Sequence, residues 1–170
     1  MATGDGNGWV TCRCGHRHWG LHGAAGLLLV RTTGADPGAE PGSWEALLQL
    51  RAAWTDQGGT WGLPGGAADS HEDAPAAALR EAWEETGVEP GALRVLDQVV
   101  GTDHGDWRYT VVVATAVAPV HPDAANAESD EVRWVAGADA PGLPLHHGLA
   151  ETWAQLSARV EQLLPELTGA

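Results

Sequence analysis

Apolar residues along this chain form short continuous runs and, near the end, one periodic stretch. The run at 24–31 is followed by the turn-rich segment 32–43, which predicts a buried strand and then a loop. Two more strands are predicted at 93–101 and 107–118, because the second is rich in Val and Thr and the turn at 103–106 separates them.

Two segments and a helix complete this pattern. The segment 47–51 fits a strand or a helix by pattern alone, and 119–130 is expected to be a loop. From 148 to 164, apolar residues recur at helical spacing, which predicts a helix that packs by one face. Its apolar positions are Leu149, Trp153, Leu156, Val160 and Leu163. The alternation of strands and helices predicts an α/β fold.

A second helix is predicted at 73–86 from local signals. N-cap oxygens are available from Asp69, Ser70 and Asp73. Pro75 is tolerated in a first turn, 76–79 are good helix formers, and Gly87 suits the left-handed position that ends a helix. The side that faces away from the carboxylates, and is expected to be buried, carries Leu79, Ala82, Trp83 and Thr86.

Three carboxylates share one face of this helix, because Glu81, Glu84 and Glu85 stand at i, i+3 and i+4. Like charges repel, and a hard divalent cation removes the repulsion because it takes oxygen ligands. The lack of a thiol or imidazole on that face favours Mg²⁺ or Mn²⁺ over Zn²⁺. The alternative is a solvated acidic face, against which the fixed spacing to Gly66 and Arg80 argues.

The run from 66 to 88 resembles the signature of the Nudix hydrolases, Gly-x5-Glu-x7-Arg-Glu-U-x-Glu-Glu-x-Gly-U, in which U is a bulky aliphatic residue. The fixed positions are filled by Gly66, Glu72, Arg80, Glu81, Glu84, Glu85 and Gly87. Ala82 is the one departure, since it is small where U is expected, and it affects packing more than chemistry. The lead-in WGLPGG at 61–66 is also similar to that of the family.

The resemblance implies an α/β/α sandwich with a mixed β-sheet between helices, in which 47–51 is a strand. It implies one Nudix domain over 1–170, with the box at 66–88 and with 1–20 as an N-terminal extension or edge strand. The implied activity is that of a MutT-like nucleoside diphosphate-X hydrolase, a pyrophosphohydrolase that cleaves a phosphoanhydride bond.

The resemblance also implies roles for individual residues. Glu81 and Glu85 would bind Mg²⁺ or Mn²⁺ directly, and Glu84 would be a third ligand or would hold water on the ion. The Gly65 carbonyl would contribute as well. Structural support is expected from Gly66, Glu72, Arg80 and Gly87, with Arg80 reaching either Glu84 or Glu72.

The general base stays open between a box glutamate and two later residues, Glu128 and Glu131. Glu131 is predicted just before a short strand, and Glu128 on the loop that precedes it. Trp61 and Tyr109 are candidates for stacking on a nucleotide base, although core packing is the commoner role of such side chains.

The formal net charge of −14 argues against a nucleic-acid polymer as partner, which needs clustered positive charge. No apolar run is long enough to cross a membrane, and 1–11 lacks the parts of a signal peptide, so a cytoplasmic location without a membrane partner is expected. The expected partner is a small nucleotide, and a homodimer stays open.

Substrate choice depends on weaker signs. The short chain and its lead-in resemble enzymes that hydrolyse (deoxy)nucleoside triphosphates such as oxidised dGTP of the 8-oxo type. ADP-ribose hydrolases often carry a proline beyond the box, at a place held here by Asp103 and His104. The alternatives are an ADP-ribose or other nucleotide-sugar pyrophosphatase and a catalytically weak nucleotide sensor.

A separate cluster of zinc-capable residues comprises Cys12, Cys14, His16 and His18. In an extended strand these residues would span about 20 Å, so a turn at Gly15 is needed to gather them. Their spacing also departs from the usual zinc patterns. We therefore expect a strand edge with reduced thiols, because a disulfide is uncommon in a cytoplasmic protein.

Overall fold

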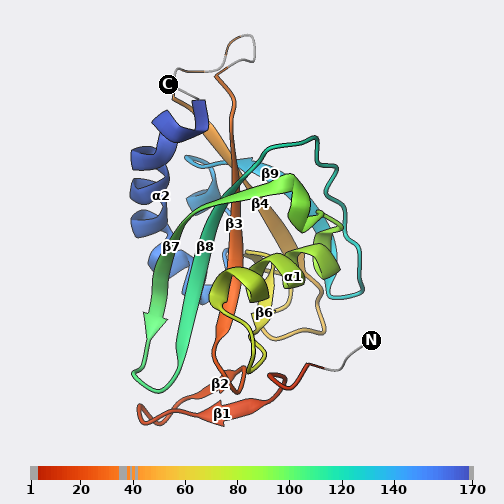
Figure 1. Ribbon diagram of the computed structural model, residues 1–170, viewed down its shortest axis with the longest axis vertical. Helices are drawn as coiled ribbons and strands as arrows, with labels where there is room; N and C mark the ends of the chain where they lie inside the picture. The colour runs from red at the N-terminus through yellow and green to blue at the C-terminus, as the bar shows by residue number, and fades with distance from the viewer. Residues whose placement is uncertain (1–3, 35–37, 39, 41, 169–170) are drawn as a thin grey trace.

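The computed structural model describes residues 4–34, 38, 40 and 42–168. Its centre is a seven-stranded mixed sheet with a helix on each face (Figure 1). The strands of this sheet are β3 (Ala24–Thr32), β4 (Trp44–Arg51), β5 (Trp61–Gly62), β6 (Gly65–Ala67), β7 (Leu93–Asp103), β8 (Arg108–Ala116) and β9 (Ser129–Ala136). The helices are α1 (Ala74–Thr86) and α2 (His147–Thr168), with short 3-10 turns η1 (Pro90–Ala92) and η2 (Ala140–Gly142).

Strand β3 is the centre of the sheet. The strand order is β5-β4-β3-β8-β7, with β6 also paired to β3 and β9 paired to β4. β3 runs parallel to β8 and antiparallel to β4 and β6. The side chains at 27–30 are all buried, because helices cover both faces, and this explains the continuous apolar run.

Two apolar cores lie on opposite faces of the sheet. The core against α2 takes from that helix the five positions that the periodicity predicts: Leu149, Trp153, Leu156, Val160 and Leu163. The core against α1 takes small residues from the helix, Ala77, Ala78 and Ala82, which pack on leucines of β3 and β4. The small side chain of Ala82 is therefore fully buried between the helix and the sheet.

These elements confirm the predicted α/β/α sandwich. The strand expected at 47–51 is the end of β4, and α1 and α2 occupy the two expected helical ranges. The loop expected at 32–43 is described only in part, because 35–37, 39 and 41 lie outside the described residues. Among the residues that the structure describes, neither helix is long and apolar enough to cross a lipid bilayer.

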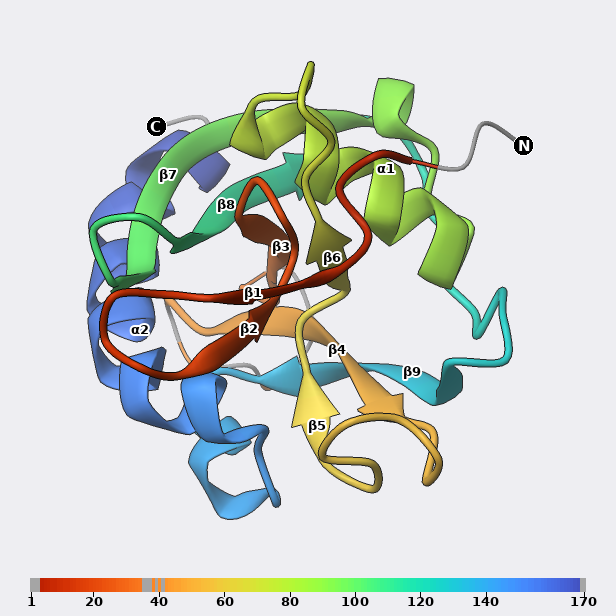
Figure 2. The same cartoon turned by 90° about the horizontal axis from the view of Figure 1, so that it is seen from below.

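The described residues between 4 and 20 do not supply an edge strand to the main sheet. β1 (Trp9–Thr11) and β2 (Arg17–Trp19) pair with each other in a separate two-stranded sheet. Figure 2 shows this hairpin lying across one end of the molecule, beside β6. Of the two alternatives for 1–20, this arrangement fits an N-terminal extension, and Gly20 and Gly23, both at positive φ, turn the chain before β3 begins.

We expect Leu156→Ala to lower the free energy of unfolding by about 2–5 kcal/mol. Leu156 is fully buried between α2 and the sheet, so truncation leaves a cavity. Urea denaturation of the two proteins measures the difference. Gln155→Ala, at the exposed neighbouring position, is the matched control and should change stability by less than about 0.5 kcal/mol. Equal losses in both variants would contradict the core assignment.

Candidate active site

The ends of α1 are fixed by the local signals in its sequence. The Asp73 carboxylate accepts a hydrogen bond of 2.9 Å from the Ala76 N–H, and Pro75 lies in the first turn. At the other end, Gly87 has φ of 70° and its N–H donates to the Trp83 carbonyl. The helix therefore begins and ends where the sequence predicts, and this sets the rotation of its carboxylates.

Arg80 ties the helix to the loop that precedes it. Its Nε and Nη2 each donate to a different carboxylate oxygen of Glu72, both at 2.8 Å. Nη2 also donates to the Ala67 carbonyl at 2.9 Å, and Nη1 donates to Glu81 at 2.7 Å. Arg80 reaches Glu84 as well, at 3.7 Å, so it contacts both predicted partners.

This contact has a clear electrostatic effect on the loop carboxylate. The Arg80 hydrogen bonds lower the pKa of Glu72, which stays charged and also accepts from the Asp69 N–H at 3.0 Å. The pair is bidentate and partly buried, which makes it stronger than an exposed pair. Glu72 and Arg80 thus form a structural tie between the loop and the helix.

The glycine at the start of the box is required by close packing. A Cβ at Gly66 would lie 2.5 Å from the carboxylate carbon of Glu81. Gly65, its neighbour in β6, packs against the backbone of Ala25 and Gly26 with no room for a side chain. The two glycines therefore let the box carboxylates approach the sheet backbone.

Glu85 is the buried member of the acidic set, with 3% of its surface exposed. Its carboxylate accepts a hydrogen bond of 2.8 Å from the Gly65 N–H. Burial raises the pKa of Glu85 to about 8, and the charges of Glu81 and Glu128 act in the same direction. A carboxylate in this position is costly to ionise unless a cation compensates it.

The predicted faces of α1 are partly wrong. Glu85 lies on the buried side together with Ala82, whereas Trp83, expected to be buried, is 48% exposed. The reason is tertiary: Glu85 finds the Gly65 N–H and the Gln49 side chain as partners inside the fold. Helical spacing alone does not reveal such partners.

Glu81 and Glu84 complete the acidic face. Burial raises the pKa of Glu81, while the Arg80 hydrogen bond acts in the opposite direction. The Glu84 side chain is half exposed. Within the described residues, the three carboxylates do not converge within 4.8 Å of one another, since Arg80 holds Glu81 and Gly65 holds Glu85.

This donor set fits a hard divalent cation. It offers the oxygens of three carboxylates, and burial raises the pKa of two of these groups, Glu81 and Glu85. The negative charges nearby add to the need for a counter-ion. Oxygen-only sites of this kind suit Mg²⁺ or Mn²⁺. The Gly65 N–H lies at the site through its hydrogen bond to Glu85.

Gln49 is a site residue that the sequence reading missed. It is 1% exposed on β4, accepts a hydrogen bond of 3.0 Å from the Ser129 hydroxyl, and favours the charged form of Glu85. A polar residue inside the apolar run ALLQL was the available signal. Its amide links the Glu85 carboxylate to the start of β9.

The loop before β9 is bound to the end of α1. The Ala125 N–H donates to the Glu85 carbonyl at 2.9 Å, and the Asp123 N–H donates to the Thr86 carbonyl at 3.0 Å. The Ala52 N–H donates to the Glu128 carbonyl at 2.8 Å. These bonds bring Glu128 close enough to influence the pKa values of both Glu81 and Glu85.

Glu131 has a different environment. It was expected just before a strand, but β9 begins at Ser129, so Glu131 lies inside the strand and pairs with Leu50. It is exposed and lies 3.8 Å from Arg133 on the same strand. Of the two candidates, Glu128 is the one whose charge raises the pKa values of Glu81 and Glu85.

The two aromatic candidates are built into the core that faces α2. Trp61 is 5% exposed, and the Arg133 guanidinium lies 4.4 Å from its ring centre. Tyr109 is partly buried, and its hydroxyl occupies the space beside Gly26. Both rings therefore pack in or against the core, the commoner of the two roles considered for them. Burial, reinforced by the Glu85 charge, raises the pKa of Tyr109, so its hydroxyl stays neutral.

Comparison with known proteins adds independent findings. A family model described as the NUDIX domain matches residues 20–156. The crystal structure of a Nudix hydrolase from M. smegmatis, RenU, has a TM-score of 0.82 and 43% identity, and the match covers 93% of this chain and 97% of that one.

Two curated relatives are similar over nearly the whole chain. "Putative 8-oxo-dGTP diphosphatase 3" of Mycobacterium tuberculosis is 48% identical over 161 residues, which cover 92% of this chain and 71% of the relative. A "Nucleoside triphosphate pyrophosphatase/Nudix hydrolase fusion protein" of Bifidobacterium longum is 40% identical, and the match covers 93% of this chain but 32% of that longer protein.

The raised pKa of Glu85 predicts a pH-dependent stability in the absence of divalent metal. The folded-state pKa of about 8 lies above the ordinary value of 4.5. Between these values the folded chain holds a proton that the unfolded chain has released, so the free energy of unfolding falls as pH rises. Each unit of pKa difference corresponds to about 1.4 kcal/mol.

Urea midpoints measured in a chelating buffer between pH 5 and pH 8.5 test this. We expect the wild-type midpoint to fall with pH more steeply than that of Glu85→Gln, which cannot ionise. Glu81 leaves some slope in the variant because its pKa is also raised. Parallel curves for the two proteins would show that Glu85 does not titrate in this range.

Proposed function

This chain belongs to the Nudix family of hydrolases, pyrophosphohydrolases that act on phosphoanhydride bonds, and we propose that its substrate is a (deoxy)nucleoside triphosphate of the oxidised 8-oxo-dGTP type. The proposed reaction adds water to the triphosphate and releases a nucleoside monophosphate and pyrophosphate. The observation that carries the proposed hydrolysis is the acidic face of Glu81, Glu84 and Glu85, which Arg80 holds against the glycine loop, defined as β6 and the residues that lead to α1 (65–73).

Divalent metal is the cofactor that this face requires. The family uses ions such as Mg²⁺ or Mn²⁺, and we assign the binding to Glu81, Glu85, Glu84 and the Gly65 carbonyl. When bound, the ion would neutralise phosphate charge and activate the attacking water. The need for such neutralisation is large, because both the triphosphate and this chain, at a net charge of −14, are strongly anionic.

The protein residues divide the remaining tasks. Arg80 and Glu72 fix the loop, and Gly66 allows Glu81 to pack against it. Gln49 orients Glu85 from the sheet. Glu128 is the proposed general base, which would take a proton from the attacking water, because its loop is bound to the C-terminal end of α1.

Support for the substrate class comes from the M. tuberculosis relative, whose name specifies 8-oxo-dGTP. An ADP-ribose or other nucleotide-sugar pyrophosphatase is the alternative within the family. The non-enzymatic alternative is a catalytically weak nucleotide sensor, and the intact carboxylates argue against it. The proposed partner is a small nucleotide, and the proposed location is the cytoplasm, where nucleoside triphosphates are made.

A screen of Mg²⁺-dependent phosphate or pyrophosphate release tests the substrate. The panel contains nucleoside triphosphates, oxidised dGTP, ADP-ribose, dinucleoside polyphosphates and nucleotide sugars. We expect the highest kcat/KM on oxidised dGTP. Preferential turnover of ADP-ribose or a nucleotide sugar would reassign the class, and nucleotide binding without turnover would favour the sensor.

Glu85→Gln should lower kcat at least about 100-fold at limiting Mg²⁺, because even outer partners of a metal site cost 10–100-fold when replaced. The change keeps the size of the side chain and removes its charge. Glu89→Gln is the matched control, since Glu89 is an exposed glutamate just beyond the same helix. Unchanged turnover in Glu85→Gln would show that Glu85 is not a metal ligand.

Glu128→Gln and Glu131→Gln, compared at saturating metal, locate the base. We expect Glu128→Gln to lower kcat by about 10²–10⁴-fold with little change in the metal concentration required, as loss of a general base does. Glu131→Gln should keep wild-type kcat because that side chain faces Arg133 on its own strand, at 3.8 Å. The reverse pattern would move the base to Glu131.

A further inference from the structure

The turn of the β1–β2 hairpin gathers three sulfur and nitrogen donors. Gly15, at φ of 86°, donates its N–H to the Cys12 carbonyl at 2.9 Å, and the Cys12 N–H donates to the His16 carbonyl at 3.0 Å. The turn at Gly15 that is needed to gather these donors is therefore present. Cys12, Cys14 and His18 point to one place, whereas His16 is exposed and is not among the converging donors, although its ring centre lies 6.4 Å from that of His104.

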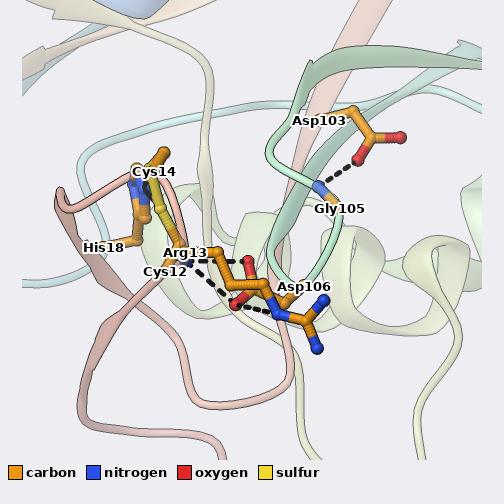
Figure 3. Close-up of a disulfide and its surroundings, with 7 residues drawn as sticks. All are labelled: Cys12, Arg13, Cys14, His18, Asp103, Gly105 and Asp106. Carbon is orange, nitrogen blue, oxygen red and sulfur yellow. Dashed lines mark hydrogen bonds and ion pairs between the residues drawn. A yellow bond between two sulfur atoms is a disulfide. The ribbon is translucent and has the colours of Figure 1, made fainter.

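The fourth donor comes from a distant part of the sequence. His104 lies in the turn between β7 and β8, where the Gly105 N–H donates to Asp103 at 2.8 Å (Figure 3). That turn is docked on the hairpin: the Arg13 N–H donates to Asp106 at 3.0 Å. The hairpin and the turn therefore present their side chains to each other in a fixed arrangement.

Aromatic packing strengthens this docking. The His18 ring stacks on two rings of the turn, with centres 4.6 Å from His104 and 4.2 Å from Trp107. The Trp107 indole N–H donates to the Gly20 carbonyl at 3.0 Å. Trp107 is thus occupied at this interface, and its stack fixes the plane of the His18 imidazole.

The four donor atoms converge. One ligand atom from each of Cys12, Cys14, His18 and His104 lies within 4.8 Å of all the others. His18 Nε2 is 3.2 Å from Cys12 Sγ and 3.6 Å from Cys14 Sγ. In a tetrahedral site with Zn–S of about 2.3 Å and Zn–N of about 2.0–2.1 Å, sulfur and nitrogen ligands lie roughly 3.5 Å apart.

The structure joins Cys12 and Cys14 as a disulfide, which corrects the expectation of reduced thiols (Figure 3). This bond links residues only two apart, so it closes a very short loop and constrains the chain little. The disulfide also does not explain why two imidazoles converge on the same sulfurs. A metal held by all four side chains would instead connect residues about ninety positions apart.

We propose that the reduced chain binds a zinc ion at Cys12, Cys14, His18 and His104, and that this site fastens the β1–β2 hairpin to the β7–β8 turn. Two thiolates and two imidazoles are a ligand set that zinc takes in closed, structural sites. Three of the four ligands precede residue 20, where the match to the family model begins, so the site is an addition to the family domain.

Forming the zinc site from the disulfide requires a reductant and no other redox partner. A phosphine or dithiol reductant supplies two electrons, two protons are taken up, and the Cys12–Cys14 bond becomes two thiols. Zinc binding then displaces those two protons and changes no oxidation state. The disulfide and the zinc site are thus alternative states of the same two sulfurs.

The site also braces the loop that leads to α1. The chain before β1 contacts this loop, because the Gly6 N–H donates to the buried Asp69 carboxylate at 2.9 Å. The Ser70 N–H donates to Asp5 at 2.8 Å. A hairpin fastened at its tip to the β7–β8 turn therefore supports the glycine loop of the candidate active site from outside.

Metal analysis of the full chain, purified with a phosphine reductant in buffer containing zinc and then desalted, tests the proposal. We expect about one zinc ion per chain in the wild type. The double variant Cys12→Ser with Cys14→Ser should lose it, and His104→Ala should bind zinc at least tenfold more weakly. His16→Ala is the matched control and should retain zinc, as should Glu85→Gln, which separates this site from the acidic face.

Cobalt substitution makes the test independent of variants that fail to fold. In the wild type, Co²⁺ should give the intense visible bands of a tetrahedral ion and a sulfur-to-cobalt charge-transfer band in the near ultraviolet. Two free thiols by titration with no bound zinc and no such bands would overturn the proposal. Zinc retained in the double serine variant would overturn the ligand assignment. A disulfide that resists reduction in the folded chain would also overturn the proposal, because the two sulfurs could not then bind zinc.

Discussion

The Arg80 guanidinium holds together the two segments on which the acidic site depends. It donates to both oxygens of Glu72, to the Ala67 carbonyl and to Glu81, so one planar side chain joins the loop, β6 and α1. A bidentate, partly buried pair has a defined geometry that an exposed pair lacks. The position of Glu81 against Gly66 follows from this tie, as does the approach of α1 to the sheet.

The same arrangement places negative charge where water cannot easily solvate it. Glu85 is buried beside the sheet, Glu81 is largely buried beside Arg80, and the loop carrying Glu128 is bound to the end of the helix. Carboxylates in such surroundings favour the fold only when a counter-charge is present. The proposed hydrolase site would therefore be a region where local stability is given up for cation binding, as functional sites often require.

The N-terminal hairpin supports this site from outside the matched family domain. The chain just before it contacts the glycine loop through Gly6 and Asp69, and the hairpin itself contacts the β7–β8 turn through Arg13 and Asp106. Proteins of this fold host varied chemistry on one scaffold. Here the added hairpin joins two loops that the central sheet holds at one end of the molecule, and the proposed zinc site lies at that junction.

The sequence by itself determined the helix at 73–86 and the buried positions of α2, because capping and helical periodicity act over a few residues. Asp73, Gly87 and Leu156 were each readable in this way. The box spacing also identified the acidic residues and their tie through Arg80.

Only the tertiary structure decided which of these residues meet others far along the chain. The burial of Glu85 in place of Trp83 depends on Gly65 and Gln49, which belong to the sheet. The influence of the Glu128 charge on Glu81 and Glu85 depends on where its loop binds the helix end. His104 replaces His16 beside the cysteines because the β7–β8 turn docks on the hairpin, and no local pattern encodes a contact between segments about ninety residues apart.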